Sequence, residues 1–197
     1  MERTFYGCTS INNSPVLPNT VTNMFWTFNG CKALVTAPVI PDSVTNMTST
    51  FANCEAMRTY QGSSDSDGDF SNYILPKNLG KLDSTFEYCK SLIIAPTIPS
   101  SVNMAVGAFR GCTSLTTAPI VHSNISDLQS IFYNCTALTG TVTINTRGSS
   151  GIGTMFKNVD FEAQNLTLTG TSTRLDDMGA TGLNYCADCN GKCNGGH

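Results

Sequence analysis

The sequence has few charged residues and only two histidines. Lysine, arginine, aspartate and glutamate make up 13% of the 197 residues, and the formal net charge is −3. An average soluble domain has about a quarter of its residues charged. The 11 lysines and arginines are scattered, so no basic stripe points to nucleic acid or to an anionic lipid surface. Serine, threonine and asparagine must therefore cover much of the surface.

Long apolar runs and the common catalytic motifs are also missing. No apolar stretch approaches the length of a membrane-spanning helix. No nucleophile elbow, phosphate-binding loop or HExxH motif occurs. His122 falls where the equivalent segments have proline, which favours a turn residue over a catalytic base. We therefore expect the protein not to be an enzyme.

What the sequence does contain is a repeated phrase. Phe-x-x-Cys-x-x-Leu, or a near match to it, occurs six times, starting at Phe5, Phe28, Phe51, Phe86, Phe109 and Phe132. Four of the five intervals between its cysteines are 23 residues long. The fifth, from Cys54 to Cys89, is 35 residues, which is one period plus a 12-residue insertion. A fixed period of this length predicts a solenoid of stacked coils.

Each coil combines two apolar periodicities. The stretch from the leucine to the proline is β-branched and threonine-rich, which predicts a strand, and internal prolines keep it short. The next stretch has apolar residues at intervals of 3, 4 and 3, as in Val44, Met47, Phe51 and Cys54. This spacing predicts one or two helical turns, and preceding serines such as Ser43 and Ser101 are candidate N-caps. Stacking the coils joins their apolar columns into one core.

Six of the nine cysteines occupy one column of the repeat. A free cysteine behaves as a small buried hydrophobe, so a column of reduced thiols in the core is one interpretation. Disulfides between neighbouring coils are the other, because paired strands lie about 4.8 Å apart, close to a bridging distance.

The repeat resembles the BspA-like leucine-rich repeats. The resemblance lies in the phrase Phe-x-Gly-Cys-x-x-Leu-x-x-Ala-Pro-x-Ile-Pro-x-Ser-Val-x-x-Met, in the 23-residue period, and in about residues 5–156. It implies a repeat solenoid: a right-handed leucine-rich-repeat α/β solenoid with short parallel strands and short helices. Repeats of this kind occur on bacterial surfaces, in some parasites and in phage-derived genes. They usually serve adhesion or ligand binding without catalysis.

Three segments are expected along the chain. Residues 1–156 form about six coils, with an insertion at 60–71 that becomes a loop. Residues 157–180 form a C-terminal cap, and 181–197 form a cysteine-rich tail. The first coil has no cap of its own, so we expect a partner to cover it, in a homo-oligomer or a larger assembly.

The acidic insertion contains a weak calcium-binding pattern. Asp65, Asp67 and Asp69 alternate as in the opening of an EF-hand loop, but the glutamate that such a loop needs later is missing. A solvated acidic loop is the alternative.

The tail contains a possible zinc site. Cys186, Cys189, Cys193 and His197 are spaced C-x2-C-x3-C-x3-H and offer three thiolates and an imidazole. A local disulfide and a disordered tail are the alternatives.

The outward residues of the predicted strands form the candidate binding face. They are rich in methyl and hydroxyl groups and carry no charge: Thr36, Val39, Ile94, Thr97, Thr117 and Ile120. Such a face suits a flat partner, either a glycan or a protein of a cell surface, bound weakly at each site and strengthened by multivalency.

Two functions are consistent with this face. The first is a non-catalytic adhesion or receptor-binding module, extracellular and displayed on a bacterial cell surface or a phage virion. Because Met1 to Thr4 lead straight into the first repeat without a visible signal peptide, the virion is favoured. The alternative is a structural virion component, such as a capsid decoration or fibre protein, that packs against neighbouring subunits.

Overall fold

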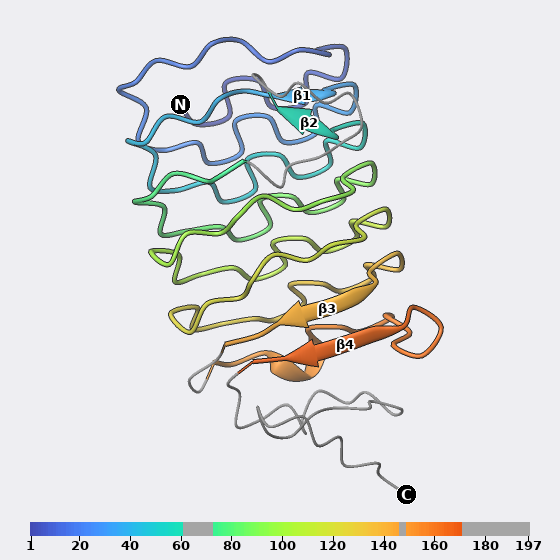
Figure 1. Cartoon of the computed structure of the whole chain (residues 1–197). Coiled ribbons are helices and arrows are strands. Elements are labelled where there is room, and N and C mark those ends of the chain that lie inside the picture. The colour runs from blue at the N-terminus through green and yellow to red at the C-terminus, as the bar shows by residue number, and fades with distance from the viewer. Residues whose placement is uncertain (61–72, 146–148, 171–197) are drawn as a thin grey trace, which may run out of the picture.

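The computed structural model describes residues 1–60, 73–145 and 149–170. The chain winds into coils that stack one on another (Figure 1). Within the described residues the regular elements are short, namely β1 (Thr36–Ala37), β2 (Thr59–Tyr60), β3 (Gly140–Thr143), the 3-10 helix η1 (Ile152–Thr154) and β4 (Leu166–Thr169). The predicted repeat solenoid is therefore confirmed.

Neighbouring coils pair in parallel along one side of the stack. Strand β1 pairs with β2, and β3 pairs with β4. Single parallel bridges continue the pattern, including Ile74 to Thr97 and Ile94 to Thr117. Proline residues at 38, 96 and 119 interrupt the strands because they have no N–H to donate. The short parallel strands expected from the sequence are thus present.

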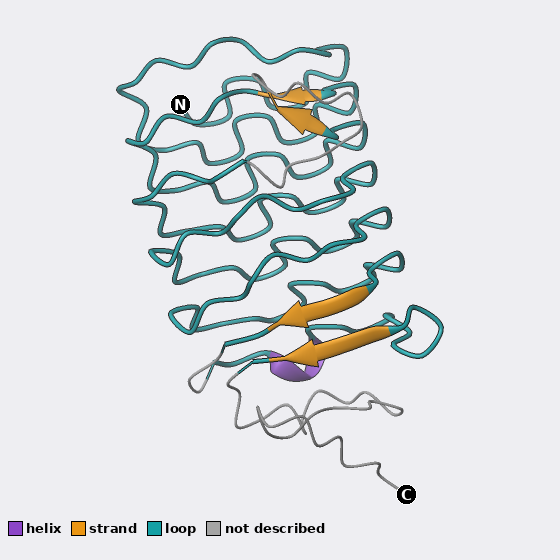
Figure 2. Cartoon of the chain, in the orientation of Figure 1, coloured by secondary structure: helices purple, strands orange, loops and turns teal. Residues whose placement is uncertain are grey.

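The expected short helices are not found in the described part of the chain, where η1 is the one helical element (Figure 2). Two positions in most coils have a left-handed backbone, as at Trp26 (φ 57°) and Gly30 (φ 78°) in the second coil. A right-handed helix cannot continue through such residues. Glycine or asparagine occupies the second of these positions in every coil but that of Tyr88, and this column is the signal in the sequence that argues against helices: Gly7, Gly30, Asn53, Gly111, Asn134 and Asn158.

Backbone N–H groups in this stretch alternate between two kinds of acceptor. Met24 and Phe28 donate to the carbonyls of Asn46 and Thr50 in the next coil, both at 2.9 Å. Thr27, between them, donates to Met24 of its own coil at 3.0 Å. The alternation makes a ladder of turns that holds the coils together. Apolar residues recur along this ladder at nearly the spacing of a helix, so a ladder of turns and a helix are hard to distinguish from sequence.

The predicted N-cap serines also bind a neighbouring coil. The Ser43 hydroxyl donates to the carbonyls of Asn19 and Val21, both at 2.7 Å. The Ser101 hydroxyl donates to the Leu79 carbonyl at 2.8 Å. Both contacts join one coil to the preceding one, so the N-cap prediction is wrong because there is no helix to cap.

A stack of phenylalanine rings runs through the core. Adjacent rings lie 5.0 to 5.8 Å apart between centroids, with interplanar angles of 20° or less. The stack comprises Phe5, Phe28, Phe51, Phe86, Phe109, Phe132 and Phe156. Phe161 meets Phe156 edge-on, at 5.2 Å and 77°, beyond the last coil. The stack explains the strict phenylalanine column, because each ring packs against its equivalents.

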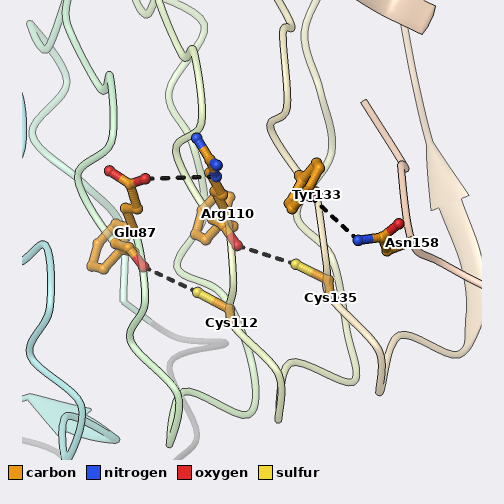
Figure 3. Close-up of polar contacts among 8 residues, drawn as sticks. Glu87, Arg110, Cys112, Tyr133, Cys135 and Asn158 are labelled. Atoms are coloured by element: carbon orange, nitrogen blue, oxygen red, sulfur yellow. Dashed lines mark hydrogen bonds and ion pairs between the residues drawn. The ribbon is translucent and has the colours of Figure 1, made fainter. Parts of the chain in front are cut away.

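The cysteine column runs beside the phenylalanine stack as free thiols. Each buried thiol donates to the carbonyl of the phenylalanine in the preceding coil, with Sγ–O distances of 3.0 to 3.2 Å. Figure 3 shows two of these contacts, made by Cys112 and Cys135. Of the two interpretations of the column, the structure has the reduced one. The thiol fills a small apolar site and also joins two coils.

The predicted insertion at 60–71 lies almost wholly outside the described residues. The chain enters it after Tyr60 and leaves it at Tyr73, and these two rings lie 4.5 Å apart. Tyr73 takes the place of the strand proline, and its buried hydroxyl accepts a hydrogen bond from the Ile40 N–H at 3.1 Å. The proposed division into coils, cap and tail stays a prediction.

Candidate binding surface

The six residues of the predicted binding face come together on the paired side of the stack. Val39 and Ile120 are 55% and 52% exposed, Thr97 and Thr117 are exposed, and Thr36 and Ile94 are half-buried. Parallel pairing places equivalent residues of adjacent coils side by side, as in the Ile94 to Thr117 bridge. The repeat therefore turns a column of the sequence into a continuous surface.

Two further apolar residues belong to this surface. Val16 is 86% exposed and Ile74 is 68% exposed, more than any other large apolar side chain in the described residues. Ile74 is not among the residues predicted from sequence, because the 12-residue insertion moves its coil out of the regular period. Ile74 follows Val39 by one period plus the length of the insertion, so aligning the coils with this offset identifies Ile74 as the equivalent of Val39. We call the following eight residues the strand face: Val16, Thr36, Val39, Ile74, Ile94, Thr97, Thr117 and Ile120.

A shallow pocket of about 290 Å³ indents the strand face. Its walls come from two adjacent coils, residues 94–98 and 117–120, together with His122. Proline occupies one position in each wall, at Pro96 and Pro119, so the rim has few hydrogen-bond donors. The His122 ring nitrogen Nε2 lies 2.9 Å from the Ile98 carbonyl, which ties the imidazole to the backbone. The pocket therefore offers mainly methyl groups to a partner.

Several charged side chains pair in the turns next to the phenylalanine and cysteine columns, outside the strand face. We call this part of the surface, which carries Lys32, Glu55, Glu87, Lys90 and Arg110, the turn side. Lys90 and Lys32 lie 2.9 and 3.4 Å from the Glu55 carboxylate across three coils. The hydrogen bond from Lys90, followed by that from Lys32, lowers the pKa of Glu55. No charged residue occurs in the strand segments at 13–16, 36–39, 94–97 and 117–120. These four segments of the candidate binding face are thus uncharged.

A second ladder on the turn side is shown in Figure 3. The Arg110 Nε lies 3.7 Å from the Glu87 carboxylate of the preceding coil. The Arg110 guanidinium also lies 4.9 Å from the centre of the Tyr133 ring. In the coil beyond, the Asn158 amide donates to the Tyr133 hydroxyl at 3.3 Å. These contacts join successive coils, and the Arg110 and Glu87 charges face each other within the protein.

The predicted metal ligands all lie outside the described residues. Asp65, Asp67 and Asp69 fall in the segment 61–72, and the three tail cysteines and His197 fall in 171–197. In the part of the chain that is described, no group of three or more histidine, cysteine, aspartate or glutamate side chains is placed to hold a metal ion. Both metal sites stay predictions.

Two solved leucine-rich repeat proteins resemble the structure. One, from T. pallidum, has 23% sequence identity and a TM-score of 0.56, and the match covers 73% of this chain and 64% of the other. The second, from Bacteroides ovatus, has 22% identity and a TM-score of 0.57, with 86% and 42% covered. The chain thus spans about two thirds or less of each of these proteins, and the likeness concerns the fold. A search of curated proteins finds no match.

The sequence also matches a family of repeats. The family of BspA type leucine rich repeat regions matches residues 1–67 and 65–178, in six copies. Repeats of this type belong to bacterial surface proteins, and leucine-rich repeats in general bind protein partners rather than catalyse reactions. None of the helices in the described ranges has the length and hydropathy that a membrane crossing requires. The matched segments cover most of the sequence, and the chain belongs to the family of BspA type leucine rich repeat regions.

Proposed function

We propose that this chain is a non-catalytic adhesion module that binds a protein or glycan of a host cell through its strand face. One observation carries the proposal: a row of exposed apolar side chains crosses successive coils without a charge. Val16, Val39, Ile74 and Ile120 are all more than half exposed. Thr97 continues the column between Ile74 and Ile120. Isolated exposed apolar residues are common, but a mainly apolar column across successive coils marks an interaction surface.

The composition of the strand face favours a protein partner over a glycan. Fully burying a valine or isoleucine side chain contributes roughly 1.5–3 kcal/mol, so a few such contacts support a weak complex. The pocket between the coils of Ile94 and Thr117 would receive one apolar side chain of the partner. The hydroxyls of Thr97 and Thr117 supply hydrogen bonds at the rim, where a glycan would also bind. The same face repeated on a bacterial or virion surface would gain avidity.

Lysine substitutions on the strand face test the proposal. Thr117→Lys and Ile120→Lys each place a charge where a partner would have to desolvate it, so binding to intact host cells should fall about tenfold or more. Thr136→Lys is the matched control, because Thr136 is exposed at the turn-side position equivalent to Lys32 and Lys90. Circular dichroism should give the same unfolding midpoint for all three variants. A glycan array and a protein pull-down on the same material identify the class of partner.

Two outcomes would contradict the adhesion proposal. Equal binding by the strand-face variants and by Thr136→Lys would show that the face is not used. Stoichiometric incorporation of the chain into a virus particle, together with no binding to any cell, would instead support the structural role. In that case the strand face would pack against a neighbouring subunit, and the lysine variants would block assembly.

A further inference from the structure

The pocket of the strand face contains a backbone donor without a protein acceptor. The Ile94 to Thr117 bridge joins its two walls at one end. Within the described ranges, no bridge follows between Thr97 and Ile120. The Ile98 N–H, on the wall of the pocket, finds no acceptor among the residues that the structure describes. Ile98 is only 1% exposed, and a buried N–H without an acceptor costs free energy, so a bound group that accepts this N–H would be favoured.

The ladder is closed at the same position in the pairs of coils on either side of the pocket. The Leu75 N–H donates to the Thr97 carbonyl at 3.2 Å. The Val121 N–H donates to the Thr143 carbonyl at 2.9 Å. Leu75 and Val121 are the equivalents of Ile98 in the coils before and after it. The Ile98 N–H therefore lacks an acceptor at a position where both neighbouring coils have one.

A tyrosine hydroxyl closes the equivalent gap elsewhere in the solenoid. Ile40 is the equivalent of Ile98, and its N–H donates to the Tyr73 hydroxyl at 3.1 Å. The same hydroxyl donates to the Pro38 carbonyl at 3.3 Å. One phenol thus accepts from one residue and donates to the residue two positions earlier. Ile98 and Pro96 bring the same N–H and the same carbonyl to the pocket, and no described group bonds to either.

The walls of the pocket suit an aromatic ring. They are lined by the methyl and methylene groups of Ala95, Pro96, Ala118 and Pro119. A phenol ring packs on such groups and presents one hydroxyl, whereas a sugar ring would bring several hydroxyls that lack partners there. The imidazole of His122 is already bonded to the Ile98 carbonyl. The lining therefore favours a ligand that is apolar except at one hydroxyl.

We propose that this pocket binds a tyrosine side chain of a partner protein. The phenol hydroxyl accepts a hydrogen bond from the Ile98 N–H and donates one to the Pro96 carbonyl, as the Tyr73 hydroxyl does within the fold at Ile40 and Pro38. The inference rests on the proposed function, because it names the side chain that the partner places on the strand face.

A titration of the full chain with N-acetyltyrosinamide, followed by amide NMR, tests the proposal. The Ile98 amide should shift saturably, whereas the Ile40 amide, already bonded to Tyr73, should not. N-acetylphenylalaninamide lacks the hydroxyl and methyl glucoside lacks the apolar ring, so both should bind about tenfold more weakly. Equal affinity for the tyrosine and phenylalanine derivatives would overturn the proposal. Tighter binding of methyl glucoside would also overturn it, in favour of a glycan partner.

A variant that fills the pocket gives a second test. Pro119→Tyr places a tyrosine at the position that Tyr73 holds in its own coil, so it should abolish binding of N-acetyltyrosinamide. Undiminished binding would contradict the proposal. Tyr73→Phe is the matched control, because it removes a hydroxyl from the gap that is already closed. It should lower the unfolding midpoint and leave the titration unchanged. If Pro119→Tyr unfolds, the comparison of the tyrosine and phenylalanine derivatives decides.

The outcome is separable from that of the cell-binding experiment. A chain that binds host cells through its strand face but does not bind N-acetyltyrosinamide would overturn the tyrosine inference and leave the adhesion proposal standing. A chain that binds N-acetyltyrosinamide at Ile98 but binds no cell would support the pocket and contradict the adhesion proposal.

Discussion

Raising the pH from 8 to 10 perturbs the five buried thiols of the cysteine column. Burial raises the pKa of each from an ordinary 9.0, to about 11 for Cys31 and about 12 for Cys135, and to well above 9.0 for Cys89 and Cys112. The pKa of Cys54 is raised as well, again mainly by burial. Removing water from around a thiolate disfavours it, and this outweighs the hydrogen bond from the backbone of the preceding cysteine in the column, which lowers the pKa.

These shifts make the fold sensitive to alkali. Since the thiols of the unfolded chain lose their protons first, their contribution to stability is fully present below pH 9. It is lost as the pH rises through the window from 9 to about 11 at Cys31 and to about 12 at Cys135. At pH 10, one pH unit above the ordinary pKa of a thiol, each buried thiol lowers the free energy of unfolding by roughly 1 kcal/mol, and the five together by several kcal/mol. A domain of ordinary stability, with about 5–15 kcal/mol, would be close to unfolding.

Urea unfolding between pH 7.5 and 10.5, followed by the fluorescence of Trp26, the one tryptophan, measures this loss. Cys112→Val should reduce the loss at pH 10 by about one fifth, and Val159 in the cysteine position of the last coil indicates that valine fits. Cys8→Ser is the control, because Cys8 is exposed. A free energy of unfolding that stays constant up to pH 10, or an unchanged loss in Cys112→Val, would refute the reasoning. Disulfides between the coils would give the same flat result.

Three other predictions concern packing and metals. Gly111→Ala should lower the free energy of unfolding by roughly 2–4 kcal/mol, because φ is +72° and the added Cβ would lie 2.4 Å from a tyrosine ring. Gly140 has the same φ, but an added Cβ would have no atom within 4 Å, so Gly140→Ala should lower the free energy of unfolding by only about 1–2 kcal/mol; thermal unfolding of both variants measures the difference. Phe109→Ala should lower the free energy of unfolding by about 3–5 kcal/mol. Phe5→Ala should lower it clearly less, because Phe5 is partly exposed and stacks on one ring rather than two. Equal losses in the two variants would contradict the continuous stack. Elemental analysis of protein made without a histidine tag should find about one zinc per chain, lost in Cys189→Ser; zinc-free wild-type protein would rule the tail site out.

Much of the strand face follows from the sequence because the fold is periodic. Once equivalent positions are aligned, Val16, Val39, Thr97 and Ile120 are exposed for the same geometric reason. Prediction fails where the period is interrupted, as at Ile74 after the insertion.

The sequence by itself determined the coil length, the core columns and the side of each coil that faces outward. These depend on apolar residues that recur every 23 positions, because only stacking can bury them. The tertiary structure decided how the chain returns between strands. Helical turns and left-handed turns share nearly the same apolar spacing, and beyond the glycine and asparagine column it is the contact with the next coil that distinguishes them. Its carbonyls accept every second N–H, as from Met24 to Asn46, so the return segments become a ladder of turns.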